Sequence, residues 1–102
     1  MTDDDALKVL VALGDKVRFE IFRRLLDDAM LTSAQLVDGK SPATISHHLK
    51  ILERAGLIAF QRNGKQNEYW ASMERLSEFS QWAARASALA GTSLINEVMN
   101  KL

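Results

Sequence analysis

The chain has 102 residues, enough for one small domain with a hydrophobic core, and its 47% hydrophobic and 25% charged residues are typical of soluble globular proteins. No apolar run approaches the length of a membrane span, so we expect a single cytoplasmic domain with no membrane partner. The lack of cysteine excludes disulfides, thiolate metal sites and thiol redox sensing. A net charge of zero weighs slightly against a nucleic-acid binder, because less of the binding would come from long-range attraction.

Two helices are predicted at the start of the chain. Thr2 or Asp3 caps the first, over about residues 3–13, and Gly14 ends it. Asp15 has the position of the cap of the second helix, which closes on two aspartates at residues 27 and 28. The apolar positions are Ala6, Leu7, Leu10 and Leu13 in the first helix and Val17, Ile21, Phe22 and Leu25 in the second, with Arg18, Arg23 and Arg24 on or beside its outer face.

A short third helix and a fourth helix follow, separated by a tight turn. The third helix begins at Thr32 or Ser33, and the turn is Asp38-Gly39-Lys40. Ser41 followed by Pro42 is a helix start, because serine caps free N–H groups and proline at the first helical position loses no hydrogen bond. Helix, turn and capped helix in this order form a helix-turn-helix unit.

The fourth helix has a buried and an exposed face. Ile45, Leu49 and Leu52 recur at spacings of four and three, so we expect them to face the core. The exposed positions carry small, hydroxyl-bearing or cationic side chains, which suit a helix whose N-terminal residues enter the major groove of DNA. They are Ala43, Thr44, Ser46, His47 and Lys50. An ordinary amphipathic surface helix would show the same period, so both interpretations stay open at this point.

A two-stranded hairpin is predicted after Gly56, which is placed to end the fourth helix. Asn63-Gly64 is a strong hairpin signal, since both residues accept positive φ. Arg62 and Lys65 flank the tip, and Tyr69 and Trp70 are expected to anchor the strands to the helices, because so small a hairpin is not stable alone.

The chain is predicted to be helical again from Met73. Leu76, Phe79, Ala83, Ala86 and Ala90 alternate spacings of three and four, as in a coiled-coil seam. With Leu7 and Leu10 of the first helix, they predict a two-fold dimer through residues of about 3–13 and 73–90. The alternative is that both helices pack within one chain. Gly91-Thr92-Ser93 is expected to interrupt the helix, so that residues 91–102 form an extension, which can include a short extra helix.

Basic residues are concentrated in the middle of the chain. Between residues 40 and 65, five basic residues accompany one acid, which gives this segment a local net charge of +4. Such a segment can bind phosphate even in a neutral protein. The basic residues are Lys40, Lys50, Arg54, Arg62 and Lys65, and the acid is Glu53.

Three segments together resemble the ArsR/SmtB-type bacterial winged helix-turn-helix repressors. They are ALGDKVRFEIFRRLL (residues 12–26), ATISHHLKILERAGLI (residues 43–58) and the hairpin RNGKQNEYW (residues 62–70), of which the second is the most specific. The resemblance implies a mainly α fold with a small β-hairpin, in the order four helices, two strands and a last helix. It also implies a homodimer that binds double-stranded DNA at a palindromic operator and represses transcription. The contacts it implies come from Ser41, Ala43, Thr44, Ser46 and His47 and, in the wing, from Arg62 and Lys65.

The sequence departs from this family in two places. The turn before the fourth helix is shorter and lacks an apolar residue, which leaves the tilt between the two helices open. Metal-responsive members hold ions through a Cys-x-Cys pair, here Thr32 and Ala34, and through histidine on the last helix, which here has none. His47 and His48 are adjacent, so their side chains point about 100° apart and do not chelate one ion. We therefore expect no metal response and no cofactor.

Other functions are weighed against DNA binding. A winged-helix module that binds a protein instead of DNA is favoured by the zero net charge and the short turn. An enzyme is not expected, because the sequence offers no phosphate loop and no nucleophile–base set. As a further hypothesis, the exposed imidazole of His47 gains a proton as the pH falls and then binds phosphate more strongly. No motif identifies an effector, an operator sequence or target genes.

Overall fold

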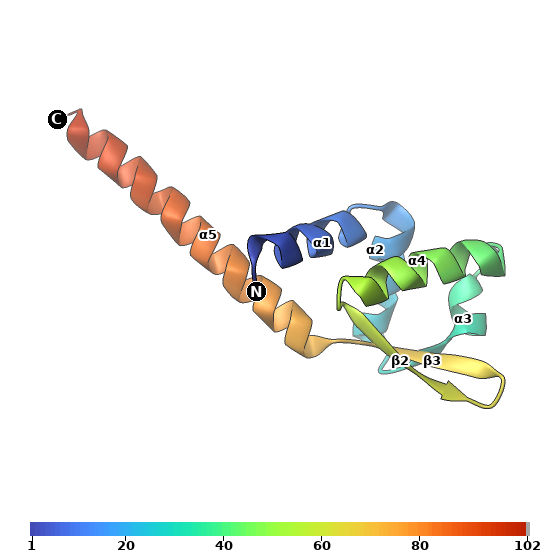
Figure 1. Ribbon diagram of the computed structural model, residues 1–102. Helices are drawn as coiled ribbons and strands as arrows, with labels where there is room; N and C mark the ends of the chain where they lie inside the picture. Colours follow the sequence, from blue (N-terminus) through green and yellow to red (C-terminus); the bar gives the residue numbers. More distant parts are fainter. Residues whose placement is uncertain (102) are drawn as a thin grey trace.

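The computed structural model describes residues 1–101, without the side chains of residues 93–95, as a helical body, a small sheet and one long helix (Figure 1). In chain order the elements are α1 (Asp3–Leu13), α2 (Lys16–Asp27), β1 (Leu31–Thr32), α3 (Ser33–Val37), α4 (Pro42–Arg54), β2 (Ile58–Asn63), β3 (Gln66–Ala71) and α5 (Met73–Asn100). This is the order expected from the sequence, with one strand added. Within the described residues, no helix combines the length and the apolarity that crossing a membrane requires.

The helix starts confirm the capping residues expected from the sequence. Thr2 Oγ1 accepts a hydrogen bond from the N–H of Asp5 at 3.1 Å, and Asp5 Oδ2 accepts one from the N–H of Thr2 at 3.2 Å. The backbone N–H of Thr2 lowers the pKa of Asp5, because it stabilises the charged carboxylate. Asp15 Oδ2 caps α2 by accepting from the N–H of Arg18 at 3.1 Å.

The core lies where α1, α2 and α4 meet the sheet. As predicted, α2 buries Ile21, Phe22 and Leu25, and α4 buries Ile45, Leu49 and Leu52. The buried side of α1 consists instead of Ala6, Val9 and Ala12, whose small size lets the helix approach its neighbours closely. Leu7 and Leu10 remain 57% and 48% exposed on its outer side.

The turn between α3 and α4 is compact and still allows the two helices to pack. Asp38 (φ 44°) and Gly39 (φ 79°) both lie in the left-handed region and reverse the chain. The N–H of Lys40 donates to the carbonyl of Val37 at 2.9 Å, which closes the turn. Leu36 of α3 is 1% exposed, so the short connection does not prevent it from reaching the core.

The sheet has three strands in the order β1-β3-β2, so the prediction of a two-stranded hairpin misses β1. Leu31 pairs with Tyr69, which links the start of α3 to the hairpin. Asn63 pairs with Gln66 within the ladder, and Gly64 (φ 63°) begins the turn. Positive φ at Gly64 is confirmed, whereas Asn63 belongs to the strand and does not have positive φ.

The last helix runs without interruption from Met73 to Asn100, so the predicted break at Gly91 is wrong. A glycine inside a helix costs only about 1 kcal/mol relative to alanine, which its helical neighbours offset. Thr92 Oγ1 donates to the carbonyl of Ala88 at 2.9 Å, so its hydroxyl is satisfied within the helix. The C-terminal half of α5 projects beyond the body, and the molecule is 66 Å long (Figure 1).

We predict opposite effects for two glycine-to-alanine changes. Gly56 has φ 78°, and an added Cβ would meet the guanidinium of Arg75, so Gly56→Ala should destabilise the fold by about 1–2 kcal/mol. Gly91 lies inside α5 with open space around it, so Gly91→Ala should stabilise it by up to about 1 kcal/mol. Urea unfolding measures both changes, and equal effects would contradict this account of Gly56.

Candidate nucleic-acid interface

The N-terminal turns of α4 display the residues that the sequence singled out. The apolar stripe of this helix faces the core, so the remaining positions point outward. Lys50 is exposed on the following turn of the same helix. The exposed set consists of Ser41, Ala43, Thr44, Ser46 and His47. These side chains can therefore contact a partner that packs against the helix, because most of the neighbouring exposed side chains are small.

Two hydroxyl groups at the start of α4 are ordered by each other. Ser41 Oγ accepts the N–H of Thr44 at 3.1 Å, so Ser41 is the helix cap. The same Ser41 hydroxyl donates to Thr44 Oγ1 at 2.7 Å. Thr44 Oγ1 is held by this contact and is exposed, so it can take part in a further hydrogen bond.

The wing places its two basic residues at the tip. Arg62 Nε donates to the carbonyl of Gly64 at 2.9 Å, which holds the side chain against the turn, and Arg62 is exposed. Lys65 follows Gly64 and is exposed. At the base of the wing, Tyr69 is buried within the hydrophobic core, in agreement with its predicted anchoring role, and Trp70 is half-buried.

A groove of about 550 Å³ joins α4 and the wing into one surface. Ser46 of α4 lines it together with Lys65, Gln66 and Asn67 of the hairpin, and α3 forms the rest of its wall. The sequence predicted both sides but missed Gln66 and Asn67, because a hairpin pattern does not show which strand faces the helices. Hydroxyl, amide and ammonium groups along one groove suit contacts to bases and phosphates.

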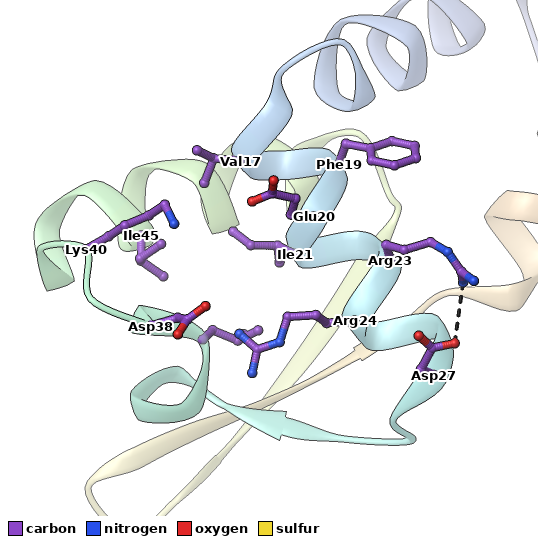
Figure 2. Close-up of a pocket in the computed structure, with 11 residues that line it drawn as sticks. Val17, Phe19, Glu20, Ile21, Arg23, Arg24, Asp27, Asp38, Lys40 and Ile45 are labelled. Carbon is purple, nitrogen blue, oxygen red and sulfur yellow. Dashed lines mark hydrogen bonds and ion pairs between the residues drawn. The ribbon is translucent and has the colours of Figure 1, made fainter.

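A second hollow, of about 340 Å³, lies between α2 and the short turn before α4 (Figure 2). Its walls include Val17, Ile21 and Ile45, and charged side chains from α2 and the turn surround it. Arg24 is held there by donating to the carbonyl of Gln35 at 3.1 Å. Asp38 and Lys40 of the turn line this hollow, so it adjoins the connection between α3 and α4.

The start of α3 is fixed by two reciprocal hydrogen bonds. Thr32 Oγ1 accepts the N–H of Gln35 at 3.2 Å, and Gln35 Oε1 accepts the N–H of Thr32 at 2.8 Å, which makes a capping box. Within the described residues, no three His, Asp or Glu side chains lie close enough together to hold a metal ion.

The residues predicted for a dimer interface fall into two groups. Leu76 and Phe79 are half-buried and pack against the core of their own chain. The others are exposed: Leu7 and Leu10 on α1, and Ala83, Ala86 and Ala90 on α5. Trp82 connects the two helices, since its Nε1 donates to Asp3 Oδ1 at 2.9 Å and its ring stacks on Phe79 at 5.9 Å between centroids.

Comparison with known proteins identifies the group to which this architecture belongs. A family described as a helix-turn-helix domain matches residues 13–59. The chain is 31% identical over 77 residues to an uncharacterised HTH-type transcriptional regulator of Methanocaldococcus jannaschii, across 74% of this chain and 86% of that relative.

Solved structures show the same fold. An ArsR-like transcriptional regulator from Rhodococcus sp. RHA1 superposes with a TM-score of 0.80 at 25% identity, over 89% of this chain and 87% of the other. A further ArsR family transcriptional regulator has a TM-score of 0.79 at 19% identity, over 89% and 95% of the two chains. The mainly α fold with a small β-hairpin is therefore confirmed as a winged helix-turn-helix. The chain belongs to the helix-turn-helix transcriptional regulators, as a member of the ArsR/SmtB-type winged helix-turn-helix family.

Proposed function

We propose that this transcriptional regulator is a homodimeric repressor that binds a palindromic operator in double-stranded DNA. The observation that carries the proposal is the groove shared by α4 and the wing, in which exposed hydroxyl, amide and ammonium groups lie on one surface. Phosphate contacts from Lys50, Arg62 and Lys65 would position the protein, and Thr44, Ser46 and His47 would read base edges. It would act in the cytoplasm on nucleoid DNA, without a metal ion or cofactor and without a catalytic role.

The exposed half of α5 supports self-association. Between Ala83 and Asn100 only Arg85 and Glu97 are charged, and Leu89 is 69% exposed on a helix that projects away from the body (Figure 1). An isolated helix of this composition has little stability in water and needs a partner for its apolar side. The helix α1 contacts α5 and carries the exposed Leu7 and Leu10, so both helices can contribute to one two-fold interface.

The geometry of such a dimer determines the spacing of the half-sites in its operator. Two copies of α4 related by a two-fold axis should be roughly 34 Å apart, so that they enter the major groove one helical turn apart. The half-sites would then be inverted repeats with centres about 10 base pairs apart.

The test is binding to the DNA upstream of the chain's own gene. Purified protein should elute as a dimer, and it should retard this fragment in a gel at concentrations that leave random DNA of equal length free. Protection footprinting should then show two symmetric half-sites. A monomeric protein that does not distinguish the two fragments would overturn the proposal.

A second candidate function is a winged-helix module that binds a protein through the hairpin or α5. The zero net charge of the chain favours this function, since much of the affinity of a protein for DNA comes from neutralising phosphates. The same gel experiment separates the two functions: retardation of the upstream fragment supports the repressor, and no retardation of any DNA supports the module.

Lys65→Ala should weaken binding to operator and random DNA alike. Lys65 is exposed beside the wing tip, where an ammonium group can neutralise a phosphate but has no fixed geometry for a base. Binding isotherms over a range of salt concentrations should show a salt slope shallower by about one per protomer. Lys101→Ala, at the far end of α5, is the matched control and should leave the slope unchanged. An unaltered slope for Lys65→Ala would remove this residue from the phosphate contacts.

A further inference from the structure

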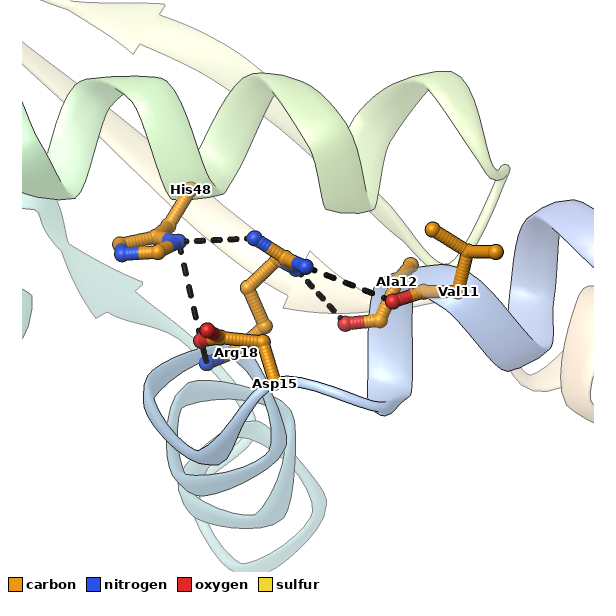
Figure 3. Close-up of polar contacts among 5 residues, drawn as sticks. All are labelled: Val11, Ala12, Asp15, Arg18 and His48. Atoms are coloured by element: carbon orange, nitrogen blue, oxygen red, sulfur yellow. Dashed lines mark hydrogen bonds and ion pairs between the residues drawn. The ribbon is translucent and has the colours of Figure 1, made fainter.

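A single arginine, Arg18, connects the three helices α1, α2 and α4. Arg18 of α2 donates from Nε to the carbonyl of Ala12 at 2.8 Å and from Nη2 to the carbonyl of Val11 at 3.4 Å, at the C-terminal end of α1. Its Nη1 lies 3.1 Å from Nδ1 of His48 on α4. Figure 3 shows the guanidinium between these partners. Arg18 thus makes the directional polar contact between α1 and α4.

The chemistry of this contact determines the protonation of His48. A guanidinium has only donors, so Nδ1 of His48 must accept, and the ring proton must be on Nε2 of a neutral imidazole. The His48 side chain is only 13% exposed, so water cannot easily replace the arginine. A second proton would have to occupy Nδ1, the atom that faces Arg18.

Asp15 provides the alternative partner. Its Oδ2 lies 3.9 Å from Nδ1 of His48, and it already accepts the N–H of Arg18. That backbone hydrogen bond is the main cause that lowers the pKa of Asp15 from 3.8, so the carboxylate stays charged throughout the range in which histidines titrate. The other titratable neighbour is His47, whose ring centroid is 5.8 Å away on the same helix. From α1 only backbone carbonyls face the cluster (Figure 3).

The contact can affect the surface of α4, because the rest of its attachment is apolar. The side chains of Ile45, Leu49 and Leu52 are buried, but hydrophobic contacts are non-directional and tolerate small rotations of the helix. A hydrogen bond to a charged donor fixes both direction and distance. His48 immediately follows His47 in sequence, so a rotation at one residue moves the other.

We propose that Arg18 is a positioning residue for α4, and that protonation of His48 breaks its contact with Arg18, turns it toward Asp15 and weakens DNA binding as the pH falls. The part that concerns DNA rests on the function proposed above. The sign is opposite to that expected for His47, whose protonation near phosphate would strengthen binding. The two histidines therefore predict opposite pH profiles.

The first test needs no DNA. Nitrogen-15 spectra of the whole protein at about pH 8 should show His48 as the Nε2–H tautomer, and lowering the pH to about 5 should shift the backbone amides at the start of α4. His47→Gln should keep these shifts, because it removes the neighbouring imidazole and leaves His48 in place. Adding His48→Gln should abolish them, since its side-chain amide oxygen can still accept from Arg18 and does not titrate. An Nδ1–H tautomer, or shifts that persist in the double variant, would overturn the proposal.

The second test measures DNA affinity over the same pH range. With His47→Gln as the background, affinity for the upstream fragment should fall by about tenfold from pH 8 to pH 5, the equivalent of one charge-assisted hydrogen bond. Adding His48→Gln should make the profile flat. Arg18→Lys keeps the charge but loses the fork of donors, so it should reduce affinity at pH 8 and also flatten the profile. A protein that passes the spectroscopic test but binds no DNA refutes the repressor function alone, whereas one that binds with an unchanged profile in His48→Gln refutes this inference alone.

Discussion

Replacing Ala86 by glutamate is expected to convert the proposed dimer into monomers and to weaken operator binding by at least about a hundredfold. Ala86 is exposed in the single chain, so the substitution should leave the fold intact. In a two-fold interface through α5, the new carboxylate would be buried without a partner, which costs about 3 kcal/mol or more. A monomer would bind only one half-site, so it would lose the affinity gained by linking two DNA-binding surfaces in one dimer. Sedimentation gives the oligomeric state, and gel retardation gives the affinity.

Ala84→Glu is the matched control. It adds the same side chain to the same helix, but at roughly 160° around the helix axis from Ala86, away from the predicted seam. It should remain dimeric and bind the operator with nearly unchanged affinity. If Ala86→Glu is as dimeric as Ala84→Glu, the interface does not run along this side of α5.

Thr44→Ala and His47→Ala are each expected to weaken operator binding by about 1–3 kcal/mol while leaving random DNA nearly unaffected. Thr44 is exposed and its hydroxyl is held by Ser41, so the alanine substitution removes an ordered polar group that suits a base edge. Titrations against operator and random fragments at one salt concentration measure the difference.

The conservative variants separate base reading from packing. Thr44→Ser keeps the hydroxyl and His47→Gln keeps a donor and an acceptor, so both should retain more operator affinity than the alanine variants. Because both positions are exposed, none of these changes should alter the unfolding midpoint much. Equal losses on the two kinds of DNA would show that Thr44 and His47 do not read sequence.

Local chemistry explains which features could be predicted. Thr2, Asp15 and Ser41 could be recognised as helix caps because a cap depends on residues three positions away along the chain. The buried stripe of α4 could be predicted as well, since helical periodicity depends only on residues that are close together in the sequence. The outward placement of Thr44 and His47 followed from that stripe.

The features that were missed depend on distant parts of the chain. A strand of two residues, β1, carries no usable pattern, and only its pairing with β3 defines it. Arg18 was expected on or beside the outer face of α2, and its contact with His48 on α4 spans thirty positions that no spacing rule connects. The continuity of α5 through Gly91 shows the opposite case, in which a local breaker signal is overridden by its helical neighbours.

The pairing of β1 with β3 also limits how the wing can move. Thr32 pairs with Glu68 in the sheet and also caps α3, so the base of the hairpin cannot swing independently of the helix-turn-helix. From Glu68 toward the tip of the hairpin, only the two-stranded ladder of β2 and β3 continues, so bending is confined to the tip. An operator would therefore have to adapt its shape to the distance between α4 and the wing. Sequences whose flanks curve easily should then be preferred even at positions that no side chain touches.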